Sequence, residues 1–241
     1  MRFTVALEKL TVLATLVAAC GHASPANSPA ARLERQSPAS KDPVIVPASG
    51  AVFIGCGFLY VANAGQIPFT VLMKGERAAQ VKGSDNVLVL DDVLVEIKMV
   101  TAAEIGSPNA RGLKLLEKHR QWEASYTAKV NGWPSLSVGG GPVEVEGADF
   151  DVMVWGYDLP REKEAYGQRI DRISYVTAAI ADSVFVVALP LRPGDDPRPP
   201  ARKARQIMRS IKRLERPLDI LELASQVKNT QGEWRDCRAA R

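Results

Sequence analysis

The clearest indication of the fold is the stretch "RISYVTAAIADSVFVVALPL", residues 172–191. Two apolar runs, "RISYVTAAI" and "SVFVVALPL", flank the dipeptide Ala181-Asp182. Runs rich in β-branched and aromatic residues on either side of a short turn are typical of a β-hairpin. Because both runs are apolar at successive positions and not only at alternate ones, we expect the sheet to be covered on both faces, at least at its centre.

The same pattern indicates further strands along the chain. Asp91-Asp92 lies between "NVLVL" and "VLVEIKMV" and predicts a second tight turn. The segment "GADF" separates another pair of short runs, "VEVE" and "DVMVWGYD". Together with the hairpin above, the expected strands are residues 51–62, 67–73, 86–90, 93–100, 143–146 and 151–158.

A first helix is expected between the two groups of strands. Ser107-Pro108 offers a capping residue followed by proline at the first helical position, and the helix is predicted to run to about Lys129. Its apolar face carries four residues at helical spacing: Leu115, His119, Trp122 and Tyr126.

A second helix is expected from about Pro200 to Leu214. Its inner stripe comprises Ala204, Ile207, Met208, Ile211 and Leu214, which recur at the spacing of an amphipathic helix. The later segment "LDILELASQV", residues 218–227, is compatible with a short third helix.

The order of these elements is strands, helix, four strands, helix. This order resembles the Mog1/PsbP-like architecture, to which the periplasmic DcrB-type lipoproteins also belong. The resemblance covers most of residues 51–216 and rests on element order, not on a motif. It implies an α+β fold in which an antiparallel β-sheet is flanked by helices, an αβα sandwich.

The first residues resemble the signal peptide of a bacterial lipoprotein. Arg2 and Lys9 precede an apolar run, residues 10–19, which is too short to span a membrane. Val17-Ala18-Ala19-Cys20 then matches a lipobox. The resemblance implies that the Cys20 thiol is lipidated, with palmitate or a similar acyl chain, and that cleavage leaves Cys20 first. An ordinary buried helix, or a signal cut elsewhere, is the alternative.

This interpretation divides the chain into three parts. Residues 1–19 are the signal peptide, residues 20–43 are a tether rich in Ala, Ser and Pro, and residues 44–241 form one α+β domain. The tether would span about 25–30 Å as a flexible coil. Gly21 stands where enteric lipoproteins retained in the inner membrane carry aspartate, so the resemblance implies an outer-membrane protein that faces the periplasm. Loss of Arg2, Lys9 and Glu8 lowers the net charge from +4 to +3.

The three cysteines are Cys20, Cys56 and Cys237. If Cys20 is lipidated, the other two are free to pair, because the cell envelope permits disulfides. Such a bond would stabilise the domain by about 5 kcal/mol in the chain-entropy description. A buried free thiol at Cys56 is the next alternative. Catalysis by Cys56 is a third, although its neighbours in "IGCGF" offer no base or positive charge.

No catalytic or metal-binding motif is recognisable. His119 is the single histidine after the tether and lies on an apolar helix face, which favours a packed structural role over acid–base catalysis. Gly139-Gly140-Gly141 lacks the lysine of a phosphate loop and is interpreted as a flexible connection. We therefore expect no cofactor and no metal ion.

Positive charge gathers in one place near the C-terminus. Eight Lys and Arg side chains fall between residues 198 and 216. Five of them recur at spacings of three or four and form a basic stripe: Arg202, Arg205, Arg209, Lys212 and Arg216. The stripe suits anionic lipid headgroups or an acidic partner protein, and the plain alternative is a solvated helix face. Nucleic acid is not an expected partner of an exported protein.

Three hypotheses of function follow. The first is a lipid-anchored, non-enzymatic accessory or binding module of the cell envelope that contacts a partner protein or a membrane surface. The second is a carrier of a small apolar ligand or lipid held between the sheet and a helix. The third is an enzyme that uses Cys56 or His119.

Overall fold

The computed structural model describes residues 49–53, 57–63, 66–81, 84, 86–165, 168–221, 223 and 235–236. Within these ranges the chain forms two longer helices, helical residues at 220, 221 and 223, and strands that all pair antiparallel, so the α+β class is confirmed. The elements are β1 (Ser49–Phe53), β2 (Gly57–Ala62), β3 (Phe69–Lys74), β4 (Arg77–Gln80), β5 (Val87–Leu90), β6 (Val93–Thr101), α2 (Gly112–Val130), β7 (Val138–Val143), β8 (Val152–Ala165), β9 (Gln168–Ile180), β10 (Ser183–Leu191), α3 (Arg198–Arg209), β11 (Ile211–Arg213) and β12 (Arg235–Asp236).

The hairpin expected from residues 172–191 is present as β9 and β10. Ile180 lies opposite Ser183, so Ala181 and Asp182 form the turn. Ala181 has a φ of 54°, a left-handed value that tight hairpin turns require. Every residue of β10 is buried, which confirms that the centre of the sheet is covered on both faces.

The second predicted turn, Asp91-Asp92, is also confirmed. Leu90 lies opposite Val93, and both aspartates have positive φ, as a type I′ turn requires. The Asp91 carboxylate does more than complete the turn. It accepts hydrogen bonds from the backbone N–H groups of Glu76 and Arg77 and from the Lys203 ammonium on α3.

The strands form two sheets, whereas one was expected. The larger sheet has the order β12-β4-β5-β6-β10-β9-β8-β7, and the smaller has the order β1-β2-β3-β11. The run 51–62, predicted as one strand, is in fact two: β1 and β2 pair antiparallel, with Phe53 opposite Phe58. Residues 54–56 lie between these strands and outside the described ranges.

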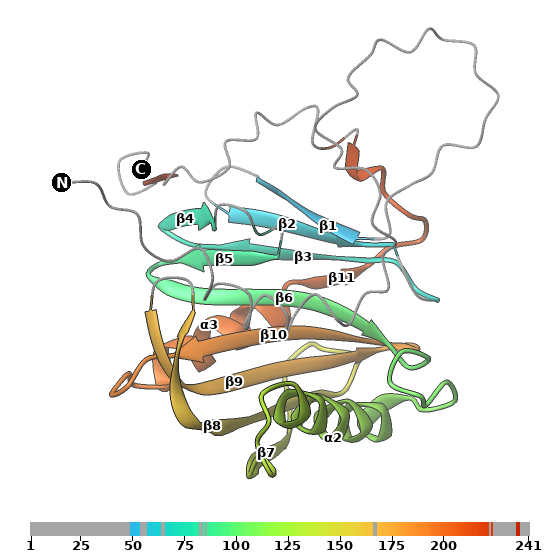
Figure 1. Ribbon diagram of the computed structural model, residues 1–241. Coiled ribbons are helices and arrows are strands. Elements are labelled where there is room, and N and C mark those ends of the chain that lie inside the picture. The colour runs from blue at the N-terminus through green and yellow to red at the C-terminus, as the bar shows by residue number, and fades with distance from the viewer. Residues whose placement is uncertain are drawn as a thin grey trace, which may run out of the picture.

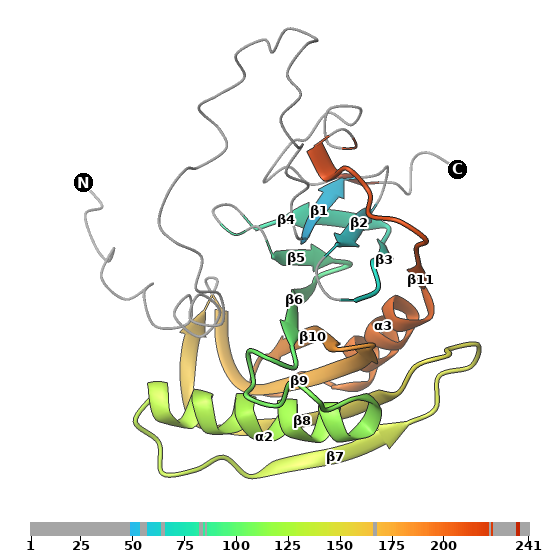
Figure 2. The same cartoon turned by 90° about the vertical axis from the view of Figure 1, so that its right-hand side faces the viewer.

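The two helices lie on opposite faces of the larger sheet (Figures 1 and 2). On one face α3 and the smaller sheet enclose a core that includes Phe69, Phe185, Ile207 and Met208. On the other face α2 covers β8, β9 and β10 through a core that includes Leu115 and Leu116. The expectation that helices flank the antiparallel sheet is therefore confirmed.

Two boundaries differ from the prediction because glycines impose a particular backbone. The first helix begins at Gly112, not at Pro108, because Gly112 has a φ of 57° and interrupts any helix from the proline. The glycine run predicted as a loop is edge strand β7, and residues 144–146 of "VEVE" follow it as coil. Gly140 permits this pairing, because a Cβ there would lie 2.2 Å from the Val154 carbonyl oxygen.

The second predicted helix is shorter than expected. It ends at Arg209, and residues 211–213 form strand β11 against β3. Ser210 explains the change of structure. Its hydroxyl donates to the Ile207 carbonyl at 2.7 Å and accepts from the Leu72 backbone N–H on β3 at 3.0 Å. It therefore ends the helix and directs the chain into the smaller sheet.

Candidate functional site

Two parts of the molecule gather charged side chains. The first is a buried network between α2 and the larger sheet, built from Lys98, Glu123, His119, Tyr157 and Tyr175. The second is the basic segment, defined here as residues 198–216, which comprises α3, β11 and the turn that follows. We describe each in turn because the two differ in what they leave accessible.

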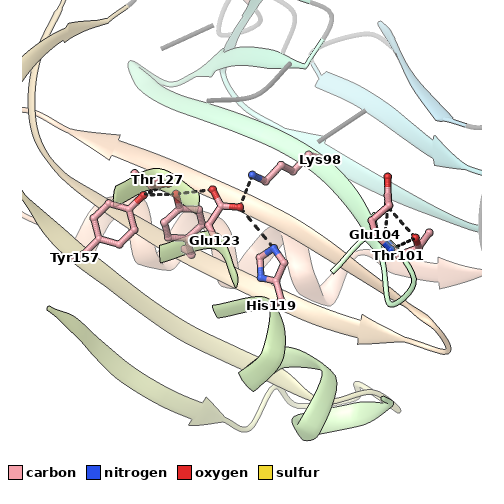
Figure 3. Close-up of polar contacts among 8 residues, drawn as sticks. Lys98, Thr101, Glu104, His119, Glu123, Thr127 and Tyr157 are labelled. Atoms are coloured by element: carbon pink, nitrogen blue, oxygen red, sulfur yellow. Dashed lines mark hydrogen bonds and ion pairs between the residues drawn. The ribbon is translucent and has the colours of Figure 1, made fainter. Parts of the chain in front are cut away.

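An ion pair lies at the centre of the buried network (Figure 3). The Lys98 ammonium on β6 is 2.8 Å from Glu123 Oε2 on α2. The side chains are 10% and 2% exposed, respectively. Charges so far from water are stable only when they are paired and hydrogen-bonded, so this contact joins the helix to the sheet.

Two tyrosines extend the network along the sheet. The Tyr175 hydroxyl donates to Glu123 Oε1 at 3.4 Å and lies 2.8 Å from the Tyr157 hydroxyl. The Tyr157 hydroxyl in turn donates to Thr127 Oγ1 at 3.4 Å. Burial raises the pKa of Tyr157 to about 12 and places that of Tyr175 well above its usual value. Both phenols are therefore neutral hydrogen-bond donors.

His119 borders the network without a hydrogen bond to it. Its ring is fully buried, and Nε2 lies 3.9 Å from Glu123 Oε2, beyond hydrogen-bonding distance. Neither ring nitrogen has a hydrogen-bond partner among the described residues. Burial lowers the pKa of His119 to about 4, so the ring is neutral at pH 7. The predicted packed position is confirmed, whereas the hydrogen bond expected of a structural histidine is absent from the described part of the chain.

Glu96 lies on the same face of β6 as Lys98, two residues earlier. It is 8% exposed, and burial raises its pKa to about 7, with Glu123 adding to the effect and Lys98 opposing it. A carboxyl group of this kind changes its protonation near neutral pH. The network thus holds groups that can carry protons, but they are enclosed.

The geometry gives the network a structural role. Its charged and phenolic side chains are at most 10% exposed. One surface pocket lies near the start of α2 and is lined by Leu113, Phe150 and Asp151 among others, and a second is lined by Glu76, Arg77, Asp91 and Asp92. Neither pocket includes a residue of the network. A substrate would reach His119 or Glu123 only if α2 moved away.

The structure contains no group of three or more His, Cys, Asp or Glu side chains suited to a metal ion within its described ranges. Cys20, Cys56 and Cys237 lie outside those ranges, so their lipidation, pairing and reactivity remain predictions of the sequence. Within the described residues, no helix is both long enough and apolar enough to cross a membrane.

The basic segment differs from the network because its charges face solvent. The five residues of the predicted stripe are all exposed. Arg202, Arg205 and Arg209 lie on the outer face of α3, whereas Lys212 lies on β11 and Arg216 follows it. The inner face of the helix is formed by Ala204, Ile207 and Met208, which are at most 1% exposed. The five exposed cations of the stripe are therefore distributed over a helix, a strand and the residues that follow it.

Half of the positive charges in this segment have a carboxylate partner. Arg198 pairs with Asp196, and Lys203 pairs with Asp91. Burial tends to raise the pKa of Asp91, but hydrogen bonds from Lys203 and from backbone N–H groups hold that pKa below its usual value.

The other two pairs use the loop between β7 and β8. Arg209 lies 3.7 Å from Glu146, and Arg213 Nη1 lies 2.9 Å from Asp149 Oδ2. We call residues 144–151 the acidic loop, since they include Glu144, Glu146, Asp149 and Asp151.

Four cations of the basic segment have no such partner. Within the described residues, no carboxylate lies at ion-pairing distance from Arg202, Arg205, Lys212 or Arg216. The segment itself contains a single carboxylate, Glu215, against eight Lys and Arg residues. A concentrated positive field at the surface is the result.

The sequence did not predict the buried network, although a signal for it exists. Glu96 and Lys98 interrupt an apolar run at alternate positions, which places both on one face of the strand. Glu123 follows His119 by four residues, so it shares the buried face of the helix. The acidic partners of Arg209 and Arg213 come from a distant loop and had no local signal.

No family model matches the sequence. No curated protein matches it either. The fold is similar to the solution structure of cyanobacterial PsbP (CyanoP) from Synechocystis sp. PCC 6803. The alignment covers 61% of this chain and 86% of that chain, at 9% identity and a TM-score of 0.39. The likeness concerns the fold alone.

Proposed function

We propose that this protein is a lipid-anchored protein of the cell envelope whose folded domain is a non-enzymatic accessory or binding module. The basic segment is its contact surface. The observation that carries this proposal is a set of four exposed cations without a described carboxylate at ion-pairing distance: Arg202, Arg205, Lys212 and Arg216, of which Arg202 still interacts at longer range with Asp196. Unneutralised surface charge adds little to folding but attracts an anionic partner.

The buried network supports a binding module over an enzyme. Its acid and base groups are enclosed between α2 and the sheet and hold these two layers together. A catalytic group must reach the proton that it transfers, either directly or through one water molecule. Burial of His119 and Glu123 prevents this while α2 is in place.

The anchor part of the proposal rests on the lipobox, residues 17–20, and has its own test. A palmitate analogue supplied to growing cells should label the protein, and Cys20→Ser should abolish the label and release the chain from the membrane fraction. Absence of labelling, with identical fractionation of the variant, would overturn the anchor.

The binding part is tested by affinity capture from solubilised envelopes. The native chain should retain an anionic envelope component that the variant R202Q/R205Q/K212Q loses. The matched control is K114Q/K118Q/K129Q, which removes three exposed positive charges from α2 on the opposite face of the sheet. Equal recovery from all three proteins would contradict the proposed surface.

A further inference from the structure

We propose that the basic segment lies on the anionic membrane surface that holds the lipid anchor, and that the acidic loop weakens this contact. The inference rests on the proposed function and names its partner as anionic phospholipid headgroups. Three observations carry it: the position of Ser49 at the start of β1, the chemistry of the exposed surface, and the ion pairs of Arg209 and Arg213.

The first described residue, Ser49, lies in line with the basic segment and follows the last residue of the expected tether by six positions. Ser49 begins β1 and lies opposite Ala62, Ala62 lies opposite Phe69, and Phe69 lies opposite Arg213. These four residues therefore form one row across the smaller sheet, which separates Ser49 from Arg213 by about 14 Å at the usual strand spacing. The smaller sheet thus presents the start of β1 and the end of the basic strand β11 at the same end.

This arrangement keeps the cations within reach of the bilayer. The tether expected from residues 20–43 spans about 25–30 Å, so an anchored domain remains close to the membrane surface. Tethering makes a second, weak contact intramolecular and raises its effective concentration. Charges that contact the headgroups act within a Debye length of about 8 Å at physiological salt.

The exposed chemistry favours headgroups over an acidic protein. Stable protein interfaces centre on buried apolar or aromatic residues, whereas contact with headgroups requires only charge and reach. The exposed large hydrophobic residues of the described chain are Leu113, Val130 and Leu221, and none lies in the basic segment. The segment presents long, flexible cations without an apolar centre.

The acidic loop competes with the membrane for two of these cations. Glu146 and Asp149 are 91% and 66% exposed and contact Arg209 and Arg213, whose side chains are 58% and 40% exposed. Exposed ion pairs of this kind are weak, so a dense anionic surface can replace them. Removing the two carboxylates should therefore strengthen membrane binding, and removing the free cations should weaken it.

The test is cosedimentation of the mature chain, residues 20–241 with Cys20→Ser, with lipid vesicles. Vesicles of phosphatidylethanolamine and phosphatidylglycerol are compared with vesicles of phosphatidylcholine alone. The unlipidated chain should bind only the anionic vesicles, and added salt should release it. R202Q/R205Q/K212Q should lower the affinity about 100-fold, at about fivefold per cation near an anionic surface.

Two further variants make the result specific to this surface. E146Q/D149N should bind the anionic vesicles about 25-fold more tightly, since it removes two exposed negative charges, each equivalent to about fivefold near such a surface. K114Q/K118Q/K129Q should bind like the native chain. Equal binding to both kinds of vesicle, or equal losses in the two triple variants, would overturn the inference.

The same variants separate this inference from the proposed function. If R202Q/R205Q/K212Q retains its vesicle binding but loses an envelope protein in affinity capture, the membrane inference is wrong and the binding module stands. If it loses neither, both are wrong. Loss of vesicle binding alone supports the membrane as the partner.

Discussion

The two helices on the larger sheet differ in where their charged groups lie: α2 buries some of them against the sheet, whereas α3 exposes its arginines to solvent. Helix α2 turns Glu123 and His119 inward, where Lys98 and two tyrosines face them. Helix α3 buries apolar residues, with Lys203 paired to Asp91 at the edge of its inner face, and keeps its arginines at the surface. Each helix covers one face of the same sheet. Their positions in the fold are therefore equivalent and do not explain why α2 buries charged groups and α3 exposes them.

The difference separates groups that hold the fold from groups that are free to bind. A buried charge must keep its partner, because an unpaired charge in the interior is costly. An exposed charge can exchange one partner for another at little cost. We therefore expect substitutions beneath α2 to affect stability and substitutions on the outer face of α3 to affect binding.

The largest effect is expected at the buried ion pair. Lys98→Met leaves the Glu123 carboxylate without its cation and should lower the free energy of unfolding by about 3–5 kcal/mol. Urea denaturation measures the change. The control Lys98→Met/Glu123→Leu removes both charges and should be less destabilised than Lys98→Met alone. If the double variant were as unstable as Lys98→Met, the unpaired Glu123 carboxylate would not be the cause of the destabilisation, and the contrast between buried and exposed charges would fail.

The next effect concerns the apolar attachment of α3. Ile207→Ala should lower the free energy of unfolding by about 2–5 kcal/mol, because Ile207 is 1% exposed and packs in the core between the two sheets. Ile207→Val should lower it by only about 0.5–1.5 kcal/mol. A negligible loss in Ile207→Ala, measured by the same unfolding curves, would mean that the cations and not the apolar face hold the helix.

The pH dependence sharpens the comparison further. The pKa of His119 falls from 6.5 to about 4 on folding, so its contribution is present above pH 6.5 and is lost as the pH falls toward 4. The pKa of Glu96 rises from 4.5 to about 7, so its contribution is present below pH 4.5 and is lost as the pH rises through 7. These opposite slopes largely cancel between pH 4.5 and 6.5.

Single variants should reveal each slope. Relative to the native chain, Glu96→Gln should gain stability as the pH rises through this window, and His119→Leu should lose it. At about 1.4 kcal/mol per pKa unit, each group changes the stability by about 3 kcal/mol at most across this window of two pH units. Parallel stability curves for the two variants would contradict the buried positions of these groups.

The smallest effect is expected at the outer face of α3. R202Q/R205Q/K212Q should change the free energy of unfolding by less than about 0.5 kcal/mol, because the three side chains are exposed and unpaired with any described carboxylate. Thermal and urea unfolding measure it. A loss comparable to that of Ile207→Ala would show that these cations stabilise the fold.

Local patterns were sufficient to predict the two tight hairpins. The turns at Asp91-Asp92 and Ala181-Asp182 separate apolar strands, and their positions follow from neighbouring residues alone. The predicted stripe rests on helical spacing, which holds for Arg202, Arg205 and Arg209, whereas the helix ends at Arg209 and Lys212 lies on strand β11.

Long-range contacts set the features that the sequence did not reveal. Gly112 and Gly140 determine where α2 begins and how β7 pairs, and the reason lies in segments distant along the chain. From the sequence alone Lys98 is expected to be an exposed strand residue, whereas in the structure it is paired with Glu123 of α2. The smaller sheet likewise depends on β11 reaching β3 across most of the chain.

The turn at Asp91 has a consequence for engineering. Asn-Gly is the dipeptide that suits a type I′ turn best, and an engineer improving this hairpin would place it at residues 91–92. That exchange would remove the carboxylate that accepts hydrogen bonds from Glu76, Arg77 and Lys203. The turn itself would become less strained, but α3 would lose the ion pair between Lys203 and Asp91. The best residue for one loop is thus the wrong residue for the assembled molecule.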